Sequence, residues 1–142
     1  MTRILHTRPA GVILPTAIVT LTLTTSWIHM NLGGLLFTLN GLGYAGLSAA
    51  YAIAAAAPHP VIARFSWLPR IALAGYTTTT IVGYLIIGPY FALGFITKGI
   101  ELTILVLLAL DVVRVYGGGR SFIRTAVDSL APFIPSGGRQ AD

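Results

Sequence analysis

Four charged residues interrupt an otherwise apolar segment of the chain. The segment FITKGIELTILVLLALDVVRVY, residues 95–116, contains Lys98, Glu101, Asp111 and Arg114. In a hydrocarbon layer each such charge costs about 3 kcal/mol on insertion scales, so it needs a partner or a function. Ionisable groups inside membranes carry protons, bind polar ligands or form ion pairs that fix helix packing. Which of these applies depends on where the segment lies and on what surrounds it.

The composition indicates an integral membrane protein. Of 142 residues, 55% are hydrophobic and only 9% are charged, and the mean hydropathy is +0.82. Soluble domains carry about 25% charged residues, and one this small cannot bury so much apolar surface in a single core. The net charge of +5 does not indicate nucleic-acid binding, because the arginines are scattered singly between apolar runs. The absence of cysteine excludes a disulfide framework, a thiolate metal site and a cysteine nucleophile.

Four apolar segments are long enough to cross a bilayer as helices. A hydrocarbon core of about 30 Å needs ~20 helical residues. Such segments lie at about residues 10–30, 35–57, 71–88 and 96–116. Residues 1–116 are therefore predicted to form an all-α transmembrane domain, a four-helix bundle. The first segment follows Arg3 and Arg8 but lacks a small-x-small cleavage site, so we expect a retained anchor.

The distribution of basic residues predicts the orientation in the membrane. With four spans, both termini lie on the same side as the loop expected at residues 58–70, which holds three prolines and two arginines. Lys98 is the single basic residue expected on the opposite side. The first side would carry eight arginines: Arg3, Arg8, Arg64, Arg70, Arg114, Arg120, Arg124 and Arg139. By the positive-inside rule, we expect a multi-pass protein of the cell (inner or plasma) membrane with both termini cytoplasmic.

Residues 117–142 are predicted to form a cytoplasmic tail with a short amphipathic helix at about 119–131. Arg120, Arg124 and Asp128 fall opposite an apolar stripe at helical spacing: Phe122, Ile123, Ala126, Val127 and Leu130. One interpretation places this helix on the cytoplasmic membrane surface, with its arginines toward anionic lipid. The other makes it a docking helix for a partner protein.

Positions along the helices predict a polar cluster in the outer half of the bundle. At 1.5 Å per residue, Glu101 lies about 20 Å from Arg114 at the inner end. Tyr84 reaches about the same level, and Asn40 lies ~9 Å below the outer boundary. His29 and Lys98 lie closer to that boundary. The predicted binding residues are therefore His29, Asn40, Tyr84, Lys98 and Glu101.

This outer cluster has two interpretations. In the first it is a structural lock, in which Lys98 pairs with Glu101 or in which Asn40 and Tyr84 hydrogen-bond the carboxyl group. In the second it is a polar pocket that opens to the outer face and binds a small head group or passes a proton.

Asp111 and Arg114, by contrast, are interpreted as an i,i+3 pair at the inner end of the fourth helix. Such a pair anchors the helix at the cytoplasmic interface. Because Asp111 lies inside the apolar run, contact with a partner subunit is an alternative role for it.

Several apparent motifs do not indicate a catalytic or cofactor site. GLGYAG, residues 41–46, matches G-x-G-x-x-G, but no strand precedes it and it lies inside a predicted span. Small residues four apart in that span predict close helix packing instead: Gly41, Ala45 and Ala49, and Gly46, Ala50 and Ala54. Haem binding is not expected, because His29 is outer whereas His6 and His59 are inner. We expect no metal, no cofactor and no catalytic residues.

Three functional hypotheses remain open. The leading one is a non-enzymatic accessory or assembly subunit of a larger membrane complex, with a membrane-protein partner or as a homo-oligomer. The second is a small-ligand binder or transporter that uses the outer pocket around Glu101. The third is a quinone-linked membrane oxidoreductase subunit in which Tyr84, His29 or Glu101 relays protons.

Overall fold

The computed structural model describes residues 8–134, and every element in that range is helical. Arg3, His6 and Arg139 lie outside the described residues. Four long helices are joined by short turns: α1 (Arg8–Asn31), α2 (Leu35–Ala56), α4 (Trp67–Ile87) and α5 (Ala92–Tyr116). The remaining elements are α3 (Pro60–Arg64), α6 (Gly119–Leu130) and a 3-10 turn, Ala131–Phe133.

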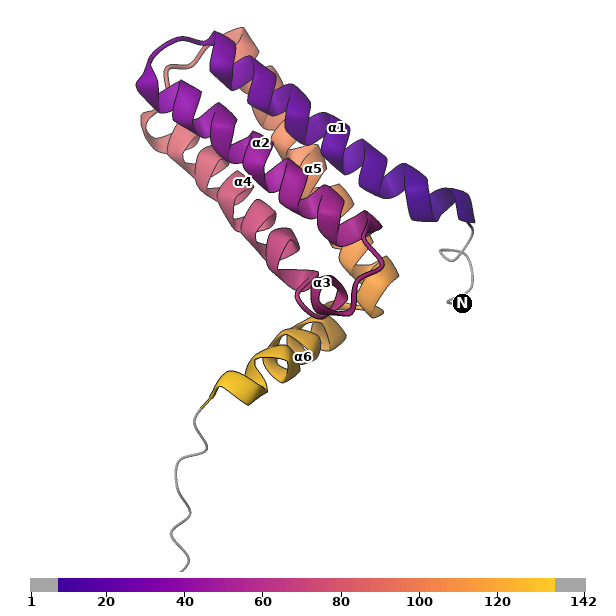
Figure 1. The fold of residues 1–142 in the computed structure, drawn as a ribbon. Coiled ribbons are helices and arrows are strands. Elements are labelled where there is room, and N and C mark those ends of the chain that lie inside the picture. Colours follow the sequence, from indigo (N-terminus) through magenta and orange to yellow (C-terminus); the bar gives the residue numbers. More distant parts are fainter. Residues whose placement is uncertain (1–7, 135–142) are drawn as a thin grey trace, which may run out of the picture.

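The four long helices pack as an antiparallel bundle. Helix α1 lies against α2 and α5, and α4 lies against the same two helices (Figure 1). The buried core contains residues from all four helices: Ile18, Tyr44, Tyr51, Leu73, Ile104 and Leu108. The turns α1–α2 and α4–α5 lie at one end of the bundle, which we call the turn end. The other end, where α3 and α6 lie, is called the α6 end.

Three of the long helices have the length and hydropathy needed to cross a membrane. They are α1 from Gly11 onward, α4 and α5. Helix α2 has a similar length, at 22 residues, but it is rich in glycine and alanine and carries Asn40. The described chain is thus all-helical with three candidate spanning helices.

Two long helices begin earlier than the apolar runs predicted. Helix α4 begins at Trp67 rather than near residue 71, with Pro69 in its first turn. Proline is tolerated there because the first amide groups of a helix have no intrahelical partner. Helix α5 begins at Ala92 rather than near residue 96. Part of the expected loop at residues 58–70 is also helical, because α3 occupies Pro60–Arg64.

Glycines at positive φ make the sharp changes of direction. Gly33 and Gly34 have φ of 78° and 87° in the turn between α1 and α2. Gly117 (φ 79°) ends α5 in the left-handed conformation, and Gly118 (φ 139°) precedes α6. Other residue types are strained in these regions. The result is that α6 leaves the bundle and runs across its axis rather than along it (Figure 1).

Candidate functional site

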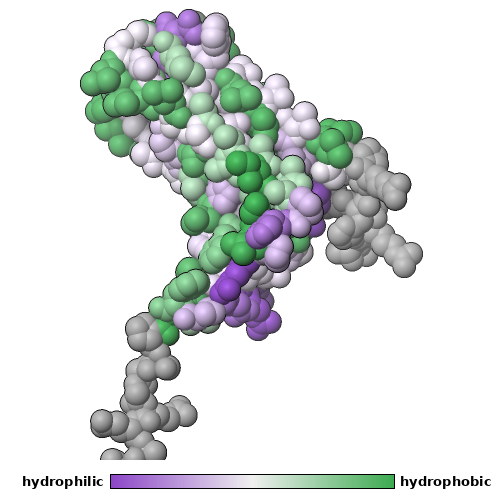
Figure 2. Space-filling model, in the orientation of Figure 1, coloured by the Kyte–Doolittle hydropathy of each residue, from purple (hydrophilic) through white to green (hydrophobic). Residues whose placement is uncertain are grey.

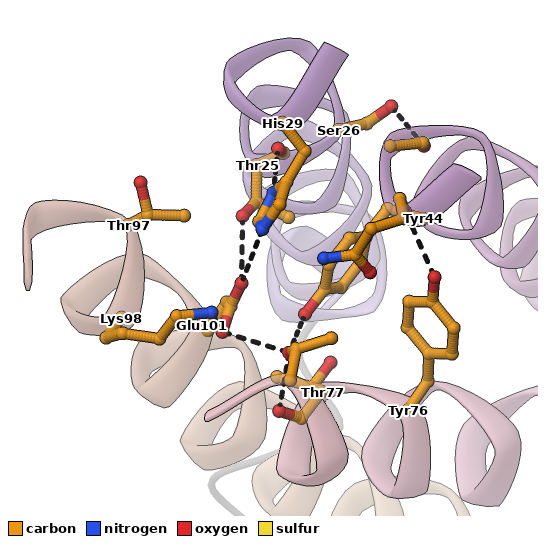
Figure 3. Close-up of polar contacts among 12 residues, drawn as sticks. Thr25, Ser26, His29, Tyr44, Tyr76, Thr77, Thr97, Lys98 and Glu101 are labelled. Atoms are coloured by element: carbon orange, nitrogen blue, oxygen red, sulfur yellow. Dashed lines mark hydrogen bonds and ion pairs between the residues drawn. The ribbon is translucent and has the colours of Figure 1, made fainter. Parts of the chain in front are cut away.

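Glu101 is fully buried in the middle of the bundle near the turn end, and polar groups surround its carboxylate (Figure 3). One oxygen, Oε2, lies 2.6 Å from Lys98 Nζ and accepts a hydrogen bond of 3.0 Å from Thr80 Oγ1. The other, Oε1, accepts a longer hydrogen bond of 3.4 Å from Thr25 Oγ1 and lies 3.7 Å from His29 Nε2. The carboxylate is thus held by α1, α4 and its own helix α5, as the high cost of an unpaired buried charge requires.

His29 places a second titratable group beside this carboxylate. Its Nδ1 lies 2.8 Å from the carbonyl oxygen of Thr25, and since a carbonyl only accepts, Nδ1 must carry a hydrogen. In the neutral ring, Nε2 then has no hydrogen and faces Glu101 as a second acceptor. Only a ring protonated at Nε2 as well, or a protonated carboxyl group, makes this contact attractive. At 3.7 Å the two atoms are too far apart for a hydrogen bond, so His29 is a close polar neighbour of the carboxylate rather than a hydrogen-bond partner.

Tyr44 connects the fourth helix to the same network. Its hydroxyl lies 2.7 Å from Thr80 Oγ1, which in turn contacts Glu101. When Thr80 donates its single hydrogen to the carboxylate, Tyr44 must donate to Thr80. This chain ties α2 to α4 and α5, so one carboxylate connects all four long helices.

The structure places all five predicted binding residues at the turn end, but in different roles. His29, Lys98 and Glu101 contact one another directly. Of the two forms considered for the lock, the pair of Lys98 with Glu101 is present, whereas among the described residues neither Asn40 nor Tyr84 hydrogen-bonds Glu101. The backbone oxygen of Asn40 accepts from Tyr76 instead, and the ring of Tyr84 lies 5.5 Å from Lys98 Nζ.

A pocket of about 460 Å³ adjoins this network at the turn end. Its polar lining includes His29, Asn40, Tyr84 and Lys98, and its walls are mainly apolar, for example Leu36, Phe37, Leu39, Ile87 and Phe91. Glu101 lies behind Lys98 and Thr80 and does not line the pocket. Lys98 therefore belongs both to the pocket lining and to the ion pair with Glu101, whose own side chain is buried.

Thr25, Tyr44 and Thr80 belong to the network around Glu101 but are not among the five predicted binding residues. Thr80 ends the TTTT run, in which Thr78 and Thr79 bond back to carbonyls four residues earlier. That run gives no sign that only its last hydroxyl reaches the carboxylate. The spacing of Thr25 and His29, four residues apart on one helix face, is the one signal that was available.

A second buried charge cluster lies at the α6 end. Asp111 is fully buried, and both its oxygens are paired: Oδ1 with Arg114 Nη2 at 2.6 Å and Oδ2 with Arg70 Nε at 2.8 Å. The Tyr51 hydroxyl also donates to Oδ2 at 2.8 Å, and Arg70 donates to the Ser66 carbonyl. The predicted i,i+3 pair with Arg114 is present, but it is part of a network that joins α2, α4 and α5.

Comparisons with protein families, curated proteins and solved structures find no match for this chain. Within residues 8–134 there is no group of three or more histidine, cysteine, aspartate or glutamate side chains that could hold a metal ion. What the site can do must therefore be argued from its own geometry. That geometry is a mainly apolar pocket with Lys98 in its lining and the buried, ion-paired carboxylate of Glu101 beside it.

Proposed function

We propose that the chain crosses the membrane four times and binds an amphiphilic small molecule in the pocket at the turn end. The three apolar helices support a membrane location. Helix α2 packs against both α1 and α4, which supports a span beside these two helices. Its backbone groups are satisfied internally, as a spanning helix requires.

The charges of the described residues support an orientation with the α6 end in the cytoplasm. Lys98 is the basic residue at the turn end, apart from His29. The α6 end carries Arg64, Arg70, Arg114, Arg120 and Arg124. Basic residues favour the cytoplasmic side of spanning helices. This orientation puts the pocket in the outer half of the membrane and both termini in the cytoplasm.

The pocket itself is the observation that carries the binding proposal. Its volume of about 460 Å³ falls in the range of small-molecule sites, ~300–1,000 Å³. Three of its lining side chains, Leu36, Leu39 and Ile87, are strongly exposed on the outside of the bundle. The pocket mouth therefore lies on the surface that faces lipid, and an apolar tail enters from the bilayer without crossing water.

The polar groups of the pocket favour a ligand with an anionic or hydrogen-bond-accepting head. Lys98 Nζ supplies up to three donors, of which Glu101 accepts one. The half-buried amide of Asn40 adds a donor and an acceptor on the facing helix. In this proposal the ion pair with Glu101 holds Lys98 in place at the pocket.

A glycine-to-leucine pair tests the pocket. Gly83 lines it and Gly75 does not, yet both are on α4 and a Cβ at either has nothing within 4 Å. We expect Gly83→Leu to lower the affinity for a fluorescent long-chain fatty acid in detergent micelles by tenfold or more, by filling the pocket, while Gly75→Leu binds like the parent protein. Equal binding by both variants would show that the pocket is not the site.

The proposed contact between Lys98 and the ligand head group is tested by comparing a charged ligand with an uncharged one. Lys98→Met should weaken binding of the fatty-acid probe more than binding of the matching fatty alcohol, because only the acid is anionic. Equal losses for acid and alcohol would assign Lys98 a packing role only.

The accessory-subunit hypothesis remains a second candidate. A Cβ at Gly46 on α2 would have nothing within 4 Å, and this glycine and Ala50 both face outward, so the backbone of a partner helix can approach closely there. Isolation in mild detergent as a stable monomer with no co-purifying protein would count against it. The quinone hypothesis uses the same pocket, and it predicts that organic extraction of the purified protein yields a quinone.

A further inference from the structure

Helix α6 is held in a fixed rotation against the α6 end of the bundle. Ser129, buried on its inner face, accepts a hydrogen bond of 2.9 Å from the indole nitrogen of Trp67. Arg64 donates to the backbone oxygen of Ser129 at 2.6 Å. At the other end of the helix, the rings of Phe122 and Tyr116 pack edge to face at 5.0 Å. These contacts at both ends determine which side of α6 faces outward.

The outward surface of α6 is divided into an apolar side and a charged side. The apolar side chains are exposed, Ile123 by 63% and Val127 by 55%, followed by Leu130, Phe133 and Ile134. Arg120, Arg124 and Asp128 are exposed on the other side. Figure 2 shows hydrophobic residues along the side of α6 that faces back toward the body of the bundle, and hydrophilic residues on the opposite side.

Apolar side chains of α4 and α5 lie beside α6. Ile71 of α4 and Val113 of α5 line a hollow of about 360 Å³ together with Phe122 of α6. If α4 and α5 span the bilayer, this hollow lies at the level where acyl chains end and head groups begin. Because α6 runs across the bundle axis, its length then lies in the plane of the membrane (Figure 1).

We propose that α6 lies in the head-group layer of an anionic cytoplasmic leaflet, with Ile123 and Val127 toward the acyl chains and Arg120 and Arg124 at the head groups. The proposal rests on the proposed membrane topology and not on the ligand pocket. The positive charge of the α6 end favours anionic lipid over other occupants of this face. The α6 end is rich in arginine, and basic residues beside an apolar helix face are attracted to anionic lipid. A second copy of the same face would instead bring these arginines together.

Single-cysteine labelling tests this placement, because the chain contains no cysteine. Val127→Cys and Asp128→Cys are adjacent and exposed but lie on different sides of α6. Each full-length variant is labelled with an environment-sensitive dye and reconstituted in nanodiscs of phosphatidylcholine with or without phosphatidylglycerol. Val106→Cys, on an exposed position of α5, serves as the reference for a label inside the bilayer.

In anionic discs we expect lipid-tail nitroxides to quench the Val127 label severalfold more than the Asp128 label, and aqueous iodide to show the reverse order. Adding Arg120→Gln and Arg124→Gln should reduce the lipid quenching of the Val127 label in anionic discs and leave it unchanged in neutral discs. Equal iodide quenching at both positions would place α6 in water and overturn the proposal.

Protection of the Val127 label from both quenchers would also overturn the proposal, because a protein surface would then cover the face. The Val106 reference separates these failures from a failure of the membrane topology. If the label at Val106 is also reached by iodide rather than by lipid nitroxide, α5 does not span the bilayer and the topology itself is wrong.

Discussion

At the level of single residues, the central feature is the buried carboxylate of Glu101. Its charge is balanced by Lys98, which also lines the pocket. Glu101 is fully buried, while Lys98 keeps partial access to the pocket. Removing one member of a buried ion pair leaves the other uncompensated, which costs more than removing both. The lock and the pocket interpretations are thus compatible: the same pair fixes the helices and presents a cation to the pocket.

This compatibility predicts strong coupling between Glu101 and Lys98. We expect Glu101→Leu to lower the free energy of unfolding by about 3 kcal/mol, the low end for a buried pair, because Lys98 retains some contact with the pocket. The double variant with Lys98→Met should lose less than the single variant. Unfolding by SDS in mixed micelles, analysed as a double-mutant cycle, measures the difference. Additive losses would mean that the two side chains act independently.

Positions along the sequence predict how far along a helix each of these residues lies, but not the direction around the helix in which it points. Asn40 and Glu101 were expected at similar depth, yet Asn40 contacts Tyr76 through its backbone and not Glu101. Depth follows from the rise per residue, whereas direction depends on how the helices rotate when they pack. Arg70 illustrates the same limit, because the sequence places it in the loop expected at residues 58–70, whereas in the structure it is a buried partner of Asp111.

At the level of the helices, small residues decide how closely neighbours approach. A Cβ at Gly41 would collide with the Met30 side chain and the Ser26 backbone oxygen of α1, and Ser26 Oγ donates to the Gly41 carbonyl at 2.7 Å. Gly46, which shares the predicted small-residue pattern, meets nothing. The pattern therefore correctly predicts close packing at Gly41. The pattern does not distinguish a glycine that packs against a neighbouring helix from one on an open surface.

Alanine substitutions at these two glycines are predicted to have opposite effects. Gly41→Ala should destabilise the bundle by ~1–3 kcal/mol, because it forces α1 and α2 apart. Gly46→Ala should be neutral or stabilising by up to about 1 kcal/mol, since alanine is the better helix former and nothing is displaced. SDS-induced unfolding of both variants measures this contrast. Similar effects at the two positions would contradict the packing of α2 against α1.

At the level of the whole molecule, the apolar runs predicted the long helices, because the length and hydropathy of a segment can be read from contiguous sequence. The starts of α4 and α5 were predicted too late: α4 already includes Trp67 and Pro69, and α5 already includes the apolar residues 92–95. The positions of α3 and α6 relative to the bundle depend on contacts distant in sequence, such as Arg64 with Ser129. Periodicity predicted that α6 is amphipathic but not what its two sides face.

The number of spans and the orientation are tested together by cysteine accessibility in intact cells. Asn31 and Tyr90 are exposed at the turn end, and His59 and Ser121 are exposed at the α6 end. With four spans and cytoplasmic termini, a membrane-impermeant maleimide should label Asn31→Cys and Tyr90→Cys from outside, and His59→Cys and Ser121→Cys only after permeabilisation. The opposite pattern at all four positions would reverse the orientation and place the pocket in the inner leaflet. If Asn31 and His59 were labelled from the same side, α2 would not cross the membrane. The proposed pocket mouth between α2 and α4 could then not open to lipid, because α2 would not cross the membrane.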